Sequence, residues 1–290
     1  ELVHAHWILP QGLIACFGKI ILGTPYIITV HGSDIFGLRK FSVLKKLAIN
    51  NANMVTVNSK ATYAGVRELS NRARVELVPM GIDTTLFHPK KLTPKKKKDL
   101  YVVAVGRLIV WKGYEFLIRA IPLMLAEKKN IKVLIVGNGP EKESLVSLAK
   151  KLGVLEHISF LGNVSQSKLS SIFADCDVFV APAITNSLTG EREGQGLAVI
   201  EAMAQGLPVV VSKSGGIQYL VDDNVTGLLV QEKDYEAIAE KVLLVLNDEK
   251  LRSRLTSMAV RSVGEKYGWK TIGKKFDIIF TNVFHNDKEV

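Results

Sequence analysis

The sequence predicts an α/β protein built from two Rossmann-like domains with parallel sheets. Short runs rich in β-branched residues alternate with helical patterns along most of the 290 residues. A lysine- and proline-rich run at residues 90–98 interrupts this alternation, since like charges and prolines disfavour regular structure. Residues 1–89 and 99–267 are therefore expected to form the two domains, and 268–290 a helix that crosses back to the first.

The first domain is expected to contain part of a parallel sheet. The pattern predicts strands at residues 2–6, 25–31, 54–58 and 75–78, and helices at 11–22, 41–51 and 59–69. Four strands make an incomplete Rossmann-like domain. The strand at 2–6 would then leave an exposed sheet edge, which is a site for pairing or aggregation.

The second domain is expected to be complete. Strands are predicted at residues 100–106, 131–137, 158–161, 178–181, 209–212 and 227–230, and helices at 113–127, 141–152, 168–174, 197–204 and 235–246. Two further helical patterns follow at 250–267 and 270–284, and they are long enough to reach the first domain.

Composition limits the class of protein. A hydrophobic content of 47% with 23% charged residues fits a soluble globular chain with a sizeable core. No apolar run reaches the roughly 18 residues of a membrane-spanning helix. Two cysteines and no signal-peptide pattern lead us to expect a cytoplasmic protein, with the inner face of a membrane as the alternative.

The formal net charge of +10 permits attraction to the phosphates of a nucleotide, a membrane or a nucleic acid. Much of this charge lies in the lysine-rich run, for which a solvated linker is favoured over a nucleic-acid or lipid-binding patch. A second basic segment, residues 38–47, alternates Arg and Lys with Leu and Phe. A helix that packs its apolar stripe on the sheet is favoured there over membrane contact.

Ligands of open α/β sheets bind at the carboxyl ends of the strands. The first strand of the second domain ends at such a place with two cations, Arg107 and Lys112, each beside a glycine. Arg107 can grip phosphate oxygens with its planar guanidinium, and Lys112 supplies a mobile point charge. We expect both to bind a phosphate group, rather than to be solvated surface residues.

Two more strand-end turns could contact a nucleotide. The turn at 137–140 contains Gly137 and Asn138, and its glycines permit close approach of the backbone. A plain tight turn explains this segment equally well. After the next strand, the turn ending at Val164 could offer backbone groups to a nucleobase.

The most informative segment is the glycine-rich loop that leads into the helix predicted at 197–204. Its backbone amides and the helix N-terminus are suited to bind a diphosphate. Glu193 lies before this helix and Glu201 within it, so the two carboxylates can accept hydrogen bonds from sugar and ribose hydroxyls. The alternative is that Glu193 only stabilises the helix N-terminus electrostatically and that Glu201 is a surface residue.

Three residues follow the second strand of the first domain, on the opposite wall of the expected cleft. Gly32 gives a substrate room to approach His31, whose imidazole can donate or accept a hydrogen bond near neutral pH. Asp34 could orient an acceptor hydroxyl or cap the following helix. His4 and His6 share one face of the first strand, where they are read as packing or supporting residues.

Together these motifs resemble the retaining glycosyltransferases of family 4, which have the GT-B fold of two Rossmann-like domains facing across a cleft. The motifs are HAHW at 4–7, TVHGSD at 29–34, VNS at 57–59, PMGID at 79–83, FHP at 87–89, GR at 106–107, KG at 112–113 and E-x7-E at 193–201, followed by AMAQGLP at 202–208. Several are weak alone, and their order makes the match specific. Members of the family usually begin with an earlier strand and glycine-rich turn, so the resemblance also implies a chain truncated at its N-terminus.

The resemblance implies a hexosyltransferase that moves a sugar from a nucleotide-sugar donor to a saccharide or lipid-linked acceptor, in polysaccharide or glycolipid synthesis. It implies that Arg107 and Lys112 bind the donor diphosphate, that Glu201 binds the ribose and that Glu193 contacts the sugar. Gly194, Gly196 and Leu197 would help to seat sugar and phosphate, and His31 would line the reaction centre. No metal or other cofactor is expected.

Two alternatives remain open at this stage. A GT-B nucleotide-sugar epimerase would use the same donor site without an acceptor groove. A basic module that binds nucleic acid or membrane would carry no chemistry, and its binding would be salt-sensitive and indifferent to Glu193 and Glu201. The resemblance leads us to expect no nucleic-acid partner.

Overall fold

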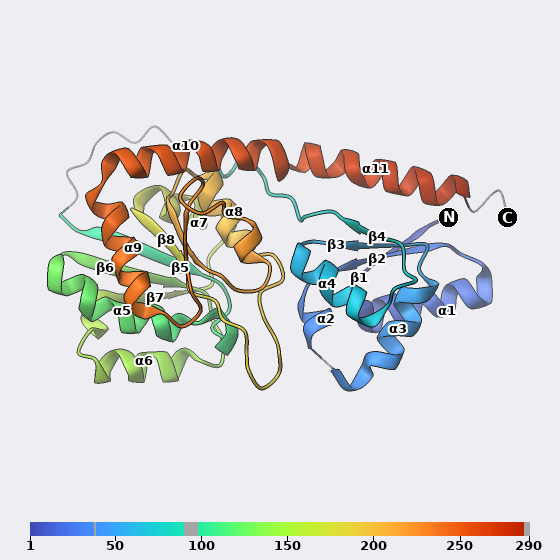
Figure 1. Ribbon diagram of the computed structural model, residues 1–290, viewed down its shortest axis with the longest axis horizontal. Coiled ribbons are helices and arrows are strands. Elements are labelled where there is room, and N and C mark those ends of the chain that lie inside the picture. Colours follow the sequence, from blue (N-terminus) through green and yellow to red (C-terminus); the bar gives the residue numbers. More distant parts are fainter. Residues whose placement is uncertain (38, 90–97, 287–290) are drawn as a thin grey trace.

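The computed structural model describes residues 1–37, 39–89 and 98–286. The described chain forms two parallel sheets, each covered by helices, which lie side by side and are spanned by two long C-terminal helices (Figure 1). The expected class of two Rossmann-like α/β domains is confirmed. The run predicted as a linker lies outside the described residues except for Lys98.

The N-terminal sheet has four parallel strands in the order β1-β2-β3-β4. The strands are β1 Val3–His6, β2 Tyr26–Val30, β3 Met54–Val57 and β4 Val75–Leu77. Every residue of β2 is buried, as expected for a central parallel strand with both faces covered. Within the described residues β1 is an edge strand, as the pattern predicted.

Helices cover both faces of this sheet. On one face lie α1 Leu13–Leu22, α3 Ser42–Asn51 and α4 Lys60–Leu69, which share a core with β2 and β3. On the other face, Ile272, Ile279 and Val283 of α11 (Trp269–Asn286) pack against Ile27 and Val78. The C-terminal helix therefore returns to the first sheet (Figure 1).

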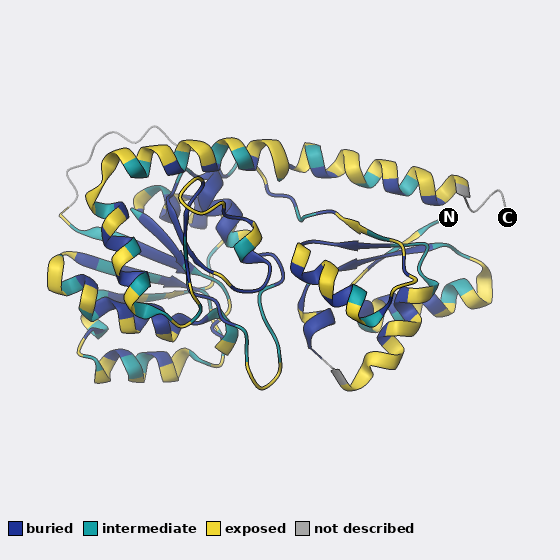
Figure 2. Ribbon diagram, viewed as in Figure 1, coloured by how far each residue is buried: buried dark blue, intermediate teal, exposed yellow. Residues whose placement is uncertain are grey.

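The C-terminal sheet has six parallel strands in the order β10-β9-β8-β5-β6-β7. They are β5 Leu100–Val105, β6 Ile131–Val136, β7 Ile158–Gly162, β8 Val178–Ala181, β9 Val209–Ser212 and β10 Leu228–Val230. The helices α5 Tyr114–Glu127, α6 Lys142–Lys151 and α9 Tyr235–Asn247 cover one face, while α7 Gln166–Asp175, α8 Leu197–Ala204 and α10 Glu249–Lys266 cover the other. Figure 2 shows the buried strands between exposed outer helix faces.

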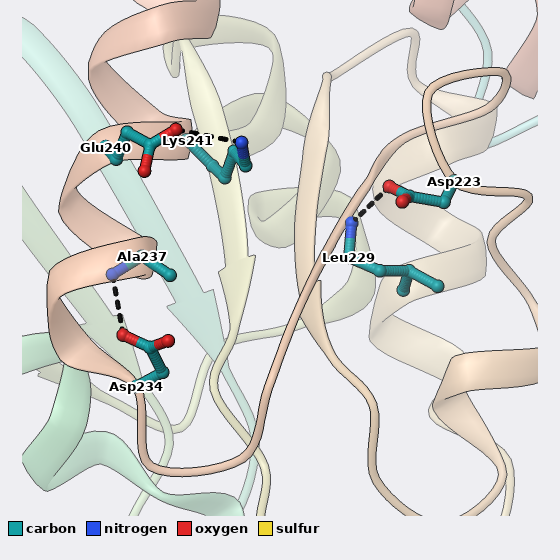
Figure 3. Close-up of polar contacts among 6 residues, drawn as sticks. All are labelled: Asp223, Leu229, Asp234, Ala237, Glu240 and Lys241. Carbon is teal, nitrogen blue, oxygen red and sulfur yellow. Dashed lines mark hydrogen bonds and ion pairs between the residues drawn. The ribbon is translucent and has the colours of Figure 1, made fainter.

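Local hydrogen bonds set several element boundaries. Asp234 accepts a hydrogen bond from the backbone N–H of Ala237 and so caps the start of α9 (Figure 3). In the same view, Asp223 accepts from the backbone N–H of Leu229 and braces the turn that leads into β10. Ser59 and Thr62 form a reciprocal capping box at the start of α4.

Several short helical segments were not predicted, and two of them follow β1 and β2. The turn Ile8–Gly12 before α1 and the four-residue helix α2 Ser33–Phe36 were not predicted. Four residues are too few to show a helical period, and Pro10 within the first turn signals a break rather than a helix. The structure places α2 directly after His31, so it shapes the loop that carries this residue.

The favoured prediction for the basic segment at 38–47 is right that the helix packs on the sheet, through Ala48 and Ile49, but wrong about the apolar stripe that was expected to do so. Lys45, Ala48 and Ile49 are the buried residues of α3, whereas Phe41 and Leu44 both remain 39% exposed. The buried ammonium of Lys45 donates to the carbonyls of Ile35 and Gly37, at the C-terminal end of α2. Part of the apolar stripe therefore faces outward instead of packing on the sheet.

Candidate active site

A cavity of about 520 Å³ lies between the two domains. It opens at the carboxyl ends of the C-terminal strands, where open α/β sheets bind ligands. Its lining residues are His31, Asn58, Met80, Val105, Gly106, Arg107, Lys112, Val136, Gly137, Asn163, Val164, Gln166, Leu169, Glu193, Gln195, Gly196, Leu197, Ala198 and Glu201. The two domains thus build one site together.

The C-terminal wall contains an ion pair between the ammonium of Lys112 and the carboxylate of Glu193. Lys112 ends the short helical turn after β5, and Gly113 follows with a φ of +67°. A Cβ at this glycine would lie 1.9 Å from the carbonyl oxygen of Pro182, so only glycine fits. The chain reversal at Gly113 therefore fixes where Lys112 meets the loop that carries Glu193.

The second carboxylate, Glu201, is buried on α8 and is 8% exposed. Burial raises the pKa of this carboxyl from 4.5 to about 7, and a hydrogen bond with Gln166 opposes that shift. The group is therefore readily protonated in the absence of a ligand. A ligand hydroxyl that donates to the carboxylate would favour its charged form.

The first domain contributes His31 to the opposite wall. The imidazole Nε2 of His31 lies 2.9 Å from Nδ1 of His6, and the carbonyl of His31 accepts a hydrogen bond from Asn58. Burial lowers the pKa of His31 and outweighs the opposing effect of Asp34, while His6 lowers the pKa further. The ring is therefore neutral near pH 7, and it can accept or donate a hydrogen bond.

The two domains touch where backbone meets backbone. A Cβ on Gly194 would lie 2.1 Å from the carbonyl oxygen of His31, and the atoms nearest to it all belong to His31 and Gly32 of the first domain. Beside it, buried Gln195 accepts from the N–H of Met80 at 2.8 Å and donates to the carbonyl of Met80 at 3.2 Å. These contacts close the cavity on the side of the Glu193 loop.

Nine of the predicted site residues line this cavity: His31, Arg107, Lys112, Gly137, Val164, Glu193, Gly196, Leu197 and Glu201. Four predicted residues lie outside its lining. Gly32 and Gly194 form the contact between the domains. Asn138 is exposed, and its carbonyl accepts from the N–H of Leu108, so it shapes the turn beside the cavity.

Asp34 has a structural position that the sequence left open. It is 5% exposed, and its two oxygens accept hydrogen bonds from the backbone N–H groups of Ile8, His31 and Gly32. The carboxylate thus holds the loop of His31, and the structure does not place it in the cavity to meet an acceptor hydroxyl.

Ten lining residues were not among the predicted site residues, and four of these are Asn58, Met80, Gln166 and Gln195. Asn58 follows β3, so the strand-end rule could have found it. Gln195 lies within the predicted loop, but nothing in the pattern shows that its amide reaches the backbone of the other domain. Among the described residues, no group of three or more His, Cys, Asp or Glu side chains could hold a metal ion.

Two family models cover most of the chain: Glycosyltransferase Family 4 matches residues 1–86, and Glycosyl transferases group 1 matches residues 87–261. An uncharacterized glycosyltransferase of Methanocaldococcus jannaschii is 30% identical over 95% of this chain and 73% of its own length. A GDP-mannose-dependent alpha-(1-6)-phosphatidylinositol monomannoside mannosyltransferase of Mycobacterium tuberculosis is 29% identical over 92% of this chain and 72% of its own.

Solved structures show the same architecture. Sucrose-phosphate synthase from Thermosynechococcus elongatus has a TM-score of 0.85 at 24% identity, over 98% of this chain and 74% of its own. Anabaena HepE in complex with UDP and glucose has a TM-score of 0.83 at 22% identity, over 97% and 77%. Two facing Rossmann-like domains with a shared cavity are the GT-B fold. The chain belongs to glycosyltransferase family 4, and the predicted resemblance is confirmed.

Proposed function

We propose that this glycosyltransferase moves a sugar from a nucleoside-diphosphate sugar to a saccharide or lipid-linked acceptor, with retention of the anomeric configuration. The observation that carries the proposal is the composition of the shared cavity. Two cations and two carboxylates line the C-terminal wall, and His31 lies on the opposite wall. Cell-surface polysaccharide or glycolipid synthesis would use such a reaction.

The cations suit the diphosphate. Arg107 and Lys112 both line the cavity beside the start of α8, whose backbone N–H groups favour anions. A diphosphate would compete with Glu193 for the ammonium of Lys112. Glu193 would then accept hydrogen bonds from the transferred sugar, and Glu201 from the ribose. The N-terminal end of α8, at Leu197, lies between these two carboxylates in the chain.

These positions support a reaction in which charge grows on the leaving group. The bond from the anomeric carbon to the diphosphate oxygen breaks, and the acceptor oxygen bonds to the same face of that carbon. The proton of the acceptor hydroxyl passes to the departing diphosphate oxygen. Arg107 and Lys112 would stabilise the negative charge on that oxygen, and the proposal needs no metal or other cofactor.

The acceptor would approach from the first domain, along the wall that contains His31. Contact with a membrane surface would suit a lipid-linked acceptor. Helices α1 and α3 contact each other, and much of their outer surface is exposed (Figure 2). The exposed residues include large apolar ones, namely Ile14, Phe17, Ile20, Ile21, Leu22, Val43, Leu44 and Leu47. Exposed Lys40 and Lys46 flank this apolar surface and would attract anionic lipid headgroups. No helix among the described residues is long and apolar enough to cross a membrane.

The proposal is tested in two stages. Thermal shifts with UDP, GDP and ADP, and with their glucose and mannose derivatives, identify the donor, because a ligand of the native state raises the melting temperature. The matching donor is then incubated with lipid extracts or saccharides, and the anomer of the product is assigned by NMR. We expect the nucleoside diphosphate to be released only with an acceptor and the product to keep the donor configuration. Acceptor-independent conversion of the sugar would instead indicate an epimerase, and an inverted product would overturn the proposed mechanism.

A further inference from the structure

Three histidines form a row beside the candidate site. His4 and His6 lie on β1, and His31 follows the neighbouring strand β2. The rings of His4 and His6 have centroids 4.5 Å apart, and those of His6 and His31 are 5.1 Å apart with 26° between their planes. Parallel pairing of His6 with Thr29 brings the end of β1 next to the loop of His31.

The contact between His6 and His31 is a hydrogen bond between two ring nitrogens. Nδ1 of His6 and Nε2 of His31 are 2.9 Å apart. A neutral imidazole has one nitrogen that donates and one that accepts, so the proton of this bond fixes the tautomer of both rings. His6 therefore determines whether the second nitrogen of His31, Nδ1, carries a hydrogen.

Burial is the main reason why the ring of His31 stays neutral. Burial and His6 lower its pKa against the opposing effect of Asp34. Burial lowers the pKa of His4 to about 4, and both other histidines add to that shift. On the side of the second domain, the ion pair of Lys112 and Glu193 lies in the same cavity.

We propose that His6 is a positioning residue whose Nδ1 accepts the Nε2–H of His31, so that Nδ1 of His31 accepts a hydrogen bond from a hydroxyl of the substrate. His6 is exposed, and an exposed neutral imidazole ordinarily keeps its hydrogen on Nε2, which leaves Nδ1 as the acceptor. His31 lines the cavity, and Nδ1 of this ring has no hydrogen-bond partner among the described residues. The proposal rests on the proposed function, since it gives one hydroxyl of the donor or acceptor its partner.

The arrangement predicts what protonation would do. When the pair takes up one proton, a single hydrogen still bridges Nδ1 of His6 and Nε2 of His31, so the added hydrogen lies on Nδ1 of His31 and this nitrogen becomes a donor. A hydroxyl that donated to this nitrogen would then lose its acceptor. Substrate use should therefore weaken as the pH falls and His31 takes up this proton.

The test compares three variants of the whole chain. His6→Phe removes the acceptor while it keeps a ring, His6→Asn restores an acceptor oxygen near the position of Nδ1, and His4→Gln is the matched control because His4 bonds Thr29 instead of His31. Long-range proton–nitrogen NMR spectra of protein labelled in its 6 histidines report each tautomer, and His31→Gln identifies the signals of His31. Circular dichroism checks the fold of each variant.

In the wild type we expect His31 as the Nε2–H tautomer. His6→Phe should give mixed tautomers, a roughly tenfold lower kcat/KM and an altered acid limb of its pH profile, as expected for loss of one hydrogen bond of about 1.4 kcal/mol. His6→Asn should restore the tautomer of His31, kcat/KM and the pH profile, and His4→Gln should change none of them. An Nδ1–H tautomer in the wild type, or an unchanged His31 in His6→Phe, would overturn the inference. Because the spectra need no substrate, they test whether His6 sets the tautomer of His31 even if the chain transfers no sugar.

Discussion

The ammonium of Lys112 forms an ion pair with the carboxylate of Glu193 inside the cavity that the two domains share. When a donor binds, each of these two side chains would exchange its present partner for a group of the ligand. The negative diphosphate would take Lys112, and the freed carboxylate would turn to sugar hydroxyls. The pair would therefore link recognition of the phosphate to recognition of the sugar.

This pair predicts a large and non-additive loss of turnover. Lys112→Ala and Glu193→Ala should each lower kcat by about 10²- to 10³-fold, because each removes a group proposed to act on charge or hydroxyls in the transition state. The double variant should lose less than the product of the two single losses. Lys241→Ala is the matched control, since Lys241 pairs with Glu240 on α9 (Figure 3). Control-like turnover in both single variants would contradict the assignment.

Glu201 predicts a pH dependence of stability. The pKa of this carboxyl is raised from 4.5 to about 7 by burial, so the native state holds a proton that the unfolded chain releases. This stabilising effect is complete below pH 4.5 and is lost as the pH rises through 7. Melting curves of wild type and Glu201→Gln from pH 4.5 to 8.5 should therefore diverge, with the wild type losing more stability at high pH. Parallel curves would show that Glu201 does not titrate in this way.

The contact at Gly194 predicts that adding one methyl group at this position would push the two domains apart. A Cβ there would collide with the carbonyl oxygen of His31 in the other domain. Gly194→Ala should keep the helical content of both domains but increase the radius of gyration measured by X-ray scattering, with kcat lowered at least about tenfold, since misplaced groups lose rate steeply. Gly273→Ala on α11 meets no atom within 4 Å and should behave as wild type. An unchanged radius together with wild-type kcat would count against closure at this point.

The exposed surface of α1 and α3 predicts binding to anionic vesicles. Ile21 and Val43 are 76% and 77% exposed, so Ile21→Glu and Val43→Glu should reduce sedimentation with phosphatidylglycerol vesicles without loss of fold. Leu188→Glu is the matched control, since Leu188 is 91% exposed in a loop of the second domain. If all four proteins sediment equally, or if the wild type does not sediment with the vesicles, this surface does not bind the membrane.

The fold was largely predictable because its signals are local. β8 Val178–Ala181, β9 Val209–Ser212 and α8 Leu197–Ala204 match their predicted bounds, since turn residues frame each apolar run. The short helix α2 was missed because four residues carry no period. The orientation of α3 was misjudged because Lys45, which the pattern places among solvated cations, buries its ammonium against carbonyl groups at the end of α2.

The candidate site was predictable where local patterns, namely strand ends and the glycine-rich start of α8, mark its residues. Strand-end positions found Arg107, Lys112 and His31, all of which line the cavity. Contacts between distant segments carry no such signal. The bonds of Gln195 to Met80 join residues 115 positions apart, and the bond of His6 to His31 depends on the parallel pairing of β1 and β2.

The central claim is that Lys112 binds the donor diphosphate and Glu193 the donor sugar. It is tested most directly by calorimetric titration of wild type, Lys112→Ala and Glu193→Ala with the matching nucleoside diphosphate and with its sugar. We predict that Lys112→Ala weakens both ligands by about tenfold or more, whereas Glu193→Ala weakens the nucleotide sugar and leaves the diphosphate as tight or tighter, because Lys112 is then free. Wild-type affinities for both ligands in both variants would contradict the account.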